Sequence, residues 1–226
     1  MGSSSLRLLL SCFLLGVPLL VTAHGVSAGD QATLASGGLL AYVLVGAKHM
    51  LTGYDHLLFL AGVIFYLSGW RDIVRFITVF TVGHSITLTG ATYLGLRADE
   101  HLVDAVIALS VVYKGFENLG GFKRIFGTTS PNLLLMVLLF GLIHGFGLAT
   151  RLQSFDIGDA QFLAKIISFN VGVELGQVAA LVPIVLLITR WQGHASYPAF
   201  YRAANWYLCI AGVGLLGWQL YGYWTT

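Results

Sequence analysis

The chain has 226 residues, of which 57% are hydrophobic and only 10% are Asp, Glu, Lys or Arg. A soluble domain of this length would carry about a quarter charged residues, so these few charges could not cover its surface. The composition excludes a soluble globular domain and predicts a polytopic membrane protein. The formal net charge of +2 is small and scattered, which argues against nucleic-acid binding. The 28 glycines suit transmembrane helices, because small residues let helices approach closely.

Residues 1–23 have the pattern of a secretory signal peptide. One basic residue, Arg7, precedes an apolar run over residues 8–21, and the segment ends in a small-x-small triplet at Ala23. Cleavage after Ala23 would leave residues 24–226 as a single transmembrane domain. The apolar run is also long enough to be a marginal uncleaved helix, and that alternative stays open.

Seven apolar runs follow a polar stretch at residues 27–36. A bilayer core needs about 20 helical residues, so the last five runs can each cross it alone and the first two are short. The sequence therefore predicts an all-α bundle of about six to seven membrane segments with a short or re-entrant first segment. The runs cover residues 37–50, 54–69, 76–94, 102–119, 131–150, 164–189 and 203–222.

Basic residues in alternate connections predict the orientation of this bundle. The positive-inside rule places connections with an excess of Lys and Arg in the cytoplasm. These connections hold Arg71, Arg75, Lys123, Arg124, Arg190 and Arg202. The intervening connections mix arginine with acidic residues, so they and the mature N-terminus would lie in the periplasm of a bacterial inner membrane.

This orientation constrains residues 37–69, which must cross the membrane a net odd number of times. Two complete spans are therefore excluded. We expect a short or re-entrant segment at 37–50 and one crossing at 54–69, with the turn at Thr52-Gly53 near the outer face. Non-helical backbone at membrane depth is tolerated where protein or a hydrated cavity surrounds it.

Ionisable residues within the runs are the next signal, because an unpaired charge in hydrocarbon is costly and usually functional. At 1.5 Å per helical residue, His144 lies about 9 Å from the outer end of its helix. By the same measure His84 and Glu174 lie about 15 Å from the outer ends of theirs. Lys114 and Glu117 lie nearer the inner face, three residues apart, where they can neutralise each other.

The segment at residues 46–56 is the densest group of candidate ligands. A glycine turn lets His49 fold back towards Asp55 and His56, so that two imidazoles and a carboxylate meet. Imidazole binds zinc, copper, nickel and iron, and a carboxylate can either ligate a metal or orient a ligating histidine. The alternative that His49 and Asp55 only cap helix ends stays open.

Three later runs carry further candidates at the same outer level. His84 lies in a hydroxyl-rich helix, His144 lies beside the small-xxx-small pair of Gly141 and Gly145, and Glu174 shares a stripe with polar neighbours. Each alone could be a packed core residue, but their common depth predicts one buried metal or proton site. The metal-ligand candidates are His49, Asp55, His56, His84, His144 and Glu174. Supporting candidates are Asn170, Gln177, Asp104 and Ser85, and His24 could add an amine and an imidazole.

Five motifs of the chain resemble the HupE/UreJ family of small membrane proteins. They are GAKHMLTGYDHLLFLAGV, FTVGHSITL, VDAVIALSVVYKGFENL, FGLIHGFGLA and FNVGVELGQ, in this order, and they cover most of residues 37–190. The resemblance implies an association with hydrogenase or urease gene clusters and a nickel or cobalt permease. Its HxxxxxDH motif implies His49, Asp55 and His56 as metal contacts.

The resemblance is closer to the second branch of this family. Met50 stands where the hydrogenase-linked branch has a proline, and His144 is a single histidine where that branch has a histidine-rich motif. These two differences from the hydrogenase-linked branch do not change the expected fold. They leave open whether the metal is nickel, cobalt or zinc.

The favoured function is a permease for a divalent transition metal, a transporter rather than an enzyme. Two alternatives stay open. One is an intramembrane zinc hydrolase, because three histidines and a carboxylate with an open position suit zinc chemistry. The other is an accessory or assembly subunit that the metal stabilises. The expected partners are the lipid bilayer, the metal ion, and a membrane protein or a second copy of the chain.

Overall fold

The computed structural model describes residues 28–67, 69–153 and 161–225, and all regular structure within these residues is helical. The elements are α2 (Ala28–Ser36), α3 (Leu39–Thr52), α4 (Tyr54–Val63), the 3-10 turn η2 (Ile64–Tyr66), α5 (Trp70–Leu94), α6 (Glu100–Asn118), the π-helical turn η3 (Phe122–Phe126), α7 (Leu133–Leu152), α8 (Phe162–Trp191) and α9 (Tyr197–Thr225). The all-α prediction is confirmed, and each predicted run corresponds to one helix from α3 to α9. The predicted signal peptide and His24 lie outside the described residues.

Within the described residues, three helices are long and apolar enough to cross a membrane, namely α5, α7 and α8. Helix α3 is apolar but only 14 residues long. Helix α6 has 19 residues and contains two acidic residues and one lysine beyond its first turn, at Asp104, Lys114 and Glu117. The chain is a membrane protein, and the count of six to seven segments stays a prediction.

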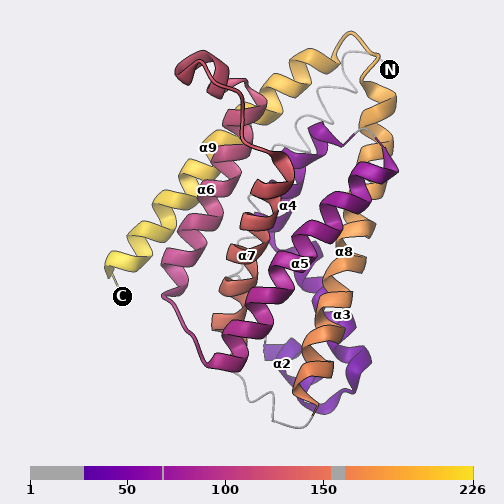
Figure 1. Ribbon diagram of the computed structural model, residues 1–226, viewed down its shortest axis with the longest axis vertical. Coiled ribbons are helices and arrows are strands. Elements are labelled where there is room, and N and C mark those ends of the chain that lie inside the picture. The colour runs from indigo at the N-terminus through magenta and orange to yellow at the C-terminus, as the bar shows by residue number, and fades with distance from the viewer. Residues whose placement is uncertain (1–27, 68, 154–160, 226) are drawn as a thin grey trace.

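Figure 1 shows the long helices running between two ends of the bundle. Helix α2, the connection from α5 to α6 and the C-terminus lie at one end. The start of α5, the η3 loop and the connection from α8 to α9 lie at the other. The predicted cytoplasmic basic residues lie in these last three segments or in the helix turns next to them, so the charge pattern and the helix directions agree. We call the η3 end the inner end and the α2 end the outer end.

Helices α3 and α8 pack backbone against backbone through two glycines. A Cβ atom on Gly46 would collide with the carbonyl oxygen of Phe169, and one on Gly172 would collide with that of Val43. Neither position can hold a side chain without separating the helices. Small residues thus build this contact as expected for helices in lipid.

Helices α5 and α7 pack in the same way. A Cβ atom on Gly141 would meet the carbonyl oxygen of Phe80, and one on Gly145 would meet that of His84. The predicted contact face of Gly141 and Gly145 is confirmed, and its partner is α5. Because α7 lies so close to α5, His144 is brought beside the middle of the neighbouring helix.

Helix α3 runs in the same direction as α8 along its outer half. Near the outer end, Lys165 Nζ lies 6.0 Å from the centre of the Tyr42 ring. Further along, Met50 packs against Gly176, which lies about 21 Å from the start of α8. The end of α3 therefore reaches roughly the mid-length of the bundle.

Gly53 breaks the helical path at this level, and α4 continues it towards the inner end. There Phe65 of η2 packs against Tyr201 near the start of α9, with ring centres 4.9 Å apart. The turn at Thr52-Gly53 thus lies between two successive helices at mid-length, not near the outer face as predicted. The positions of the basic residues require only that residues 37–69 cross the membrane a net odd number of times. Helices α3 and α4 together make one crossing that is interrupted at Gly53, so this requirement is met.

Candidate metal centre

Asp55 fixes the side chain of His56 in the first turn of α4. Its Oδ1 accepts hydrogen bonds from the backbone N–H of His56 at 2.6 Å and from the ring Nδ1 at 2.7 Å. A carboxylate can only accept, so Nδ1 carries the proton and Nε2 keeps its lone pair when the ring is neutral. Gly53 makes room for this arrangement, because a Cβ there would lie 2.6 Å from His56 Nδ1.

His84 and His144 repeat this pattern on α5 and α7. His84 Nδ1 donates to Oδ1 of Asn170 at 3.0 Å, and the amide nitrogen of Asn170 is itself bonded to Ile166. His144 Nδ1 donates to the carbonyl oxygen of Phe140 at 2.7 Å. Both imidazoles are completely or almost completely buried. In each ring Nδ1 is thus occupied by an oxygen acceptor.

The Nε2 atoms of His56, His84 and His144 are buried and have no hydrogen-bond partner among the described residues. A buried polar atom without a partner is unusual in native structures and calls for a ligand, ion or water. Histidines that bind metals commonly donate the other ring nitrogen to an oxygen, as these three do. The donor set therefore suits a transition-metal ion.

These three side chains, with His49, form one cluster, which we call the histidine cluster. The ring centres of His56 and His144 are 4.9 Å apart, as are those of His49 and His56. His84 lies next to them, because Phe80 packs against both His84 and His144, with ring centres 6.1 Å and 5.4 Å apart. In the described residues no three His, Cys, Asp or Glu side chains are yet placed to bind one ion together. Metal binding would therefore require side-chain rotation.

Two polar residues of α8 face α5, as their common stripe predicts. Asn170 holds His84, and the side-chain oxygen of Gln177 lies 3.4 Å from the hydroxyl of Thr81. The amide nitrogen of Gln177 is buried without a hydrogen-bond partner among the described residues. Glu174 lies between them in sequence but is only half-buried, and its role as a metal ligand stays a prediction.

Two supporting candidates lie apart from the histidine cluster. Asp104 accepts a hydrogen bond from Arg151 at 2.5 Å and another from Gln219 at 3.2 Å, which ties α6 to α7 and α9. This carboxylate pairs with an arginine, and its supporting role at a metal site stays a prediction. Arg151 itself lies buried in the last turn of α7. Ser85 is half-buried, and its supporting role stays a prediction.

A layer of buried aromatic rings lies on the inner side of the histidine cluster. Phe59 of α4 packs against His144 at 5.7 Å between ring centres, and against Phe140 at 5.1 Å. It also contacts Phe80 and Phe76 of α5 at 6.0 Å and 6.2 Å. Because these rings fill the space between α4, α5 and α7, the histidine cluster is closed towards the inner end.

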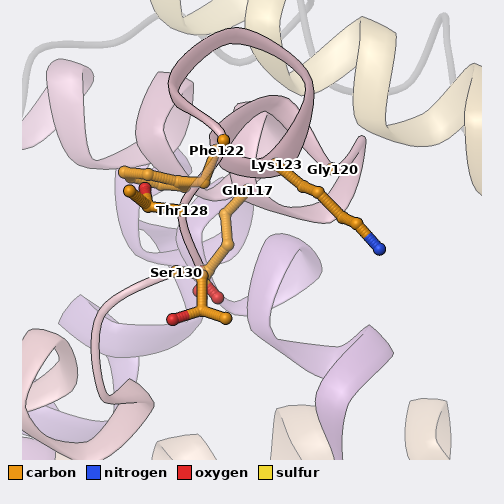
Figure 2. A pocket seen from close by; sticks show the side chains of 8 residues that line it. Glu117, Gly120, Phe122, Lys123, Thr128 and Ser130 are labelled. Atoms are coloured by element: carbon orange, nitrogen blue, oxygen red, sulfur yellow. The ribbon is translucent and has the colours of Figure 1, made fainter.

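Beyond this layer lies the predicted pair of Lys114 and Glu117, which is confirmed. Lys114 Nζ donates to Glu117 Oε2 at 2.6 Å, and both side chains are buried. A pocket of about 320 Å³ beside η3 is lined partly by Glu117. Figure 2 shows the carboxylate of Glu117 directed towards Ser130, while Lys123 extends away from it.

Removing one partner of this buried pair should destabilise the fold strongly. Lys114→Met or Glu117→Gln alone leaves an uncompensated buried charge, which typically costs about 3–5 kcal/mol. The double variant Lys114→Met/Glu117→Met should lose much less, because no charge remains. Thermal unfolding in detergent would measure this. Single variants as stable as the wild type would mean that the pair is hydrated or absent.

The helices and the buried histidine cluster define a polytopic membrane protein with a donor set suited to a metal. A family model described as HupE / UreJ protein matches residues 28–226. The chain therefore belongs to the HupE/UreJ family, which indicates a metal-related accessory or transport role in a membrane. Comparisons with curated proteins and with solved structures found no match.

Proposed function

We propose that the protein is a permease for a divalent transition-metal ion, with His56, His84 and His144 as the core of its binding site. The observation that supports this most is the set of three buried Nε2 atoms without hydrogen-bond partners among the described residues. Imidazole nitrogen suits nickel, cobalt and zinc alike. His49 and Asp55 lie beside this core, and the family's association with metals favours metal as the cargo.

Helix directions suggest how an ion would reach the site. His49 in the last turn of α3 is only half-buried and belongs to the outer half of the bundle, so it would meet an arriving ion first. The end of α3 adds backbone carbonyl dipoles, whose negative end favours a cation at a helix break. We assign this half to the periplasmic side of the inner membrane.

Release to the cytoplasm would require movement of the aromatic layer around Phe59. The structure is closed at that layer, and the pocket beside Glu117 lies beyond it. A permease opens its two sides in turn, so the inner-closed arrangement corresponds to the state that receives the ion. Opening would separate α4 from α5 and α7.

Transport into proteoliposomes tests this proposal. Vesicles with a trapped metal-sensitive dye should take up nickel, cobalt or zinc when they contain the wild-type protein. His84→Ala should abolish the uptake, whereas His194→Ala should not, because His194 is exposed and its ring bonds to nearby Ser196. An ion that stays bound and never crosses would exclude a permease and favour an enzyme or an accessory subunit.

Asp55→Asn should weaken metal binding by about 10–100-fold, which is typical when a residue that orients a ligating histidine is lost. The asparagine oxygen can still accept from His56 Nδ1, but the negative charge that makes this imidazole a stronger donor is gone. Equilibrium dialysis with zinc or nickel measures the change. An unchanged affinity would mean that Asp55 only caps α4.

A further inference from the structure

Helix α4 carries His56 and Phe59, but its backbone belongs to a different part of the bundle from the rings that these side chains contact. The most extensive helix contacts join α3 with α8, α5 with α7 and α6 with α9. Among the described helices, α4 packs most extensively against α6. It meets α5 and α7 through aromatic rings, with the ring centre of Phe59 lying 6.0 Å from that of Phe80 and 5.1 Å from that of Phe140. Helix α4 is therefore attached to α6.

Helices α6 and α9 form a close pair, and Figure 1 shows them side by side. A Cβ atom on Gly115 would lie 2.8 Å from the carbonyl oxygen of Asn205, and one on Gly212 would lie 3.1 Å from that of Ala108. Small residues thus let the two backbones approach closely. Such close packing leaves little room for one helix to slide along the other, so α6 and α9 behave as one body.

Asn118, the last residue of α6, joins α4 to this pair. Its side-chain nitrogen has two N–H groups and donates to the carbonyl oxygen of Gly62 at 2.8 Å and to Asn205 Oδ1 at 2.5 Å. The side-chain nitrogen of Asn205 donates to the carbonyl oxygen of Tyr201, and the Tyr201 hydroxyl donates to the carbonyl oxygen of Asn118, both at 2.7 Å. Both asparagines are more than nine-tenths buried. Their amides are therefore fixed in orientation, and so is the bond to α4.

The end of α4 shows why a donor is needed there. A helix leaves its last carbonyl oxygens without helical donors, and α4 ends at Val63, where the 3-10 turn η2 begins. Asn118 supplies a donor to Gly62, which lies in this last turn. Glycine also lets α4 approach α6, because a Cβ atom on Gly62 would lie 2.9 Å from the Cβ atom of Lys114.

We propose that α4, α6 and α9 move as one body when the bundle opens towards its inner end, and that Asn118 is the positioning residue that couples them. This inference rests on the proposed function. His56, Phe59 and Gly62 follow one another at intervals of three residues and span about 9 Å of α4. A displacement of α4 with α6 and α9 therefore withdraws His56 from His144 and Phe59 from the rings of α5 and α7 in one step. The ion loses a ligand as the aromatic layer opens.

Gly53 is the hinge of this movement. Its backbone is extended, with φ −67° and ψ 107°, and it separates α3 from α4. Before it, the ring of His49 packs against Phe169 of α8, with ring centres 5.9 Å apart, so this histidine stays with α3 and α8. The histidine cluster is thus divided among three bodies, which carry His49, His56, and His84 with His144.

Pulsed electron paramagnetic resonance on the full-length protein in vesicles tests the coupling. Cys12 and Cys209 are replaced by alanine, and nitroxide labels are attached at exposed positions. Leu57→Cys on α4 is paired with Ile210→Cys on α9 or with Ile86→Cys on α5. Zinc should shift the distance between α4 and α5 and leave the distance between α4 and α9 unchanged. A zinc-dependent change between α4 and α9, or no change in either pair, would overturn the proposal.

Asn118→Leu should break the coupling, so that the distance between α4 and α9 becomes dependent on zinc. Its zinc affinity in equilibrium dialysis should equal that of the wild type, because Gly62 lies about 9 Å along α4 from His56. The maximal uptake rate should fall by about 2- to 30-fold, the range for loss of a coupling contact. Wild-type distances together with a wild-type rate in this variant would show that Asn118 is not the link.

Asn132→Ala is the matched control, because it removes an exposed asparagine that caps the start of α7. It should leave the distances and the uptake rate unchanged. Absence of metal uptake in wild-type vesicles would refute the permease. The label distances would still decide whether α4 moves with α6 and α9, because they respond to zinc binding and not to transport.

Discussion

Replacing His144 by alanine should abolish tight binding of the metal ion. His144 lies at the centre of the cluster, where its ring centre is 4.9 Å from that of His56, and Phe80 packs against both His144 and His84. The variant loses a ligand outright, so the affinity should fall by more than the roughly 10–100-fold that follows loss of an orienting residue. His84→Ala should have the same effect, because the two rings face one site from α5 and α7.

Equilibrium dialysis against zinc or nickel measures both variants beside a matched control. His101→Ala is suitable, because His101 bonds to Gln219 at 2.8 Å in the separate network near Asp104. Its metal affinity should equal that of the wild type. If both cluster variants retained full metal occupancy, the shared site would be refuted. His144→Gln keeps a large polar side chain, so loss of metal binding there excludes a simple cavity effect.

Gly172→Leu should severely destabilise the protein. The new Cβ would collide with the carbonyl oxygen of Val43, and backbone atoms cannot turn aside as a side chain can. Overpacking of a core typically costs about 1–3 kcal/mol, and a backbone collision should reach or exceed the upper value. Helices α3 and α8 would separate, and the pairing that places His49 beside Phe169 would be lost.

Gly214→Leu on α9 is the matched control, because a Cβ there meets nothing within 4 Å. Thermal unfolding in detergent should show a large loss of stability for Gly172→Leu and little change for Gly214→Leu. Metal binding should fall only in the first variant. Equal stability of the two variants would contradict the close packing of α3 on α8.

Local sequence patterns predicted the parts of the fold that depend on near neighbours. The lengths of the apolar runs predicted the helices. The three-residue spacing of Lys114 and Glu117 predicted their ion pair. The small-xxx-small spacing of Gly141 and Gly145 gave a close helix contact. In each case the residues that make the contact share one face of a single helix.

Features that depend on how distant helices meet were not accessible from the sequence. Asp104 and Arg151 are 47 residues apart, and only the packing of α6 against α7 brings them together. The depth of Gly53 follows from the register of α3 along α8, which composition does not encode. Glu174 shares a stripe with Asn170 but is only half-buried, whereas Asn170 is buried against His84. These are consequences of tertiary packing and not of local periodicity.

X-ray absorption spectroscopy of the zinc-loaded protein would show directly whether the histidine cluster holds the metal ion. Our account predicts scattering from imidazole nitrogens at about 2.0–2.1 Å from the metal, which is the usual zinc–histidine distance. This signal should disappear when His56, His84 and His144 are replaced by alanine together. A spectrum with oxygen ligands alone in the wild-type protein, or an unchanged imidazole signal in the triple variant, would contradict the proposed histidine site.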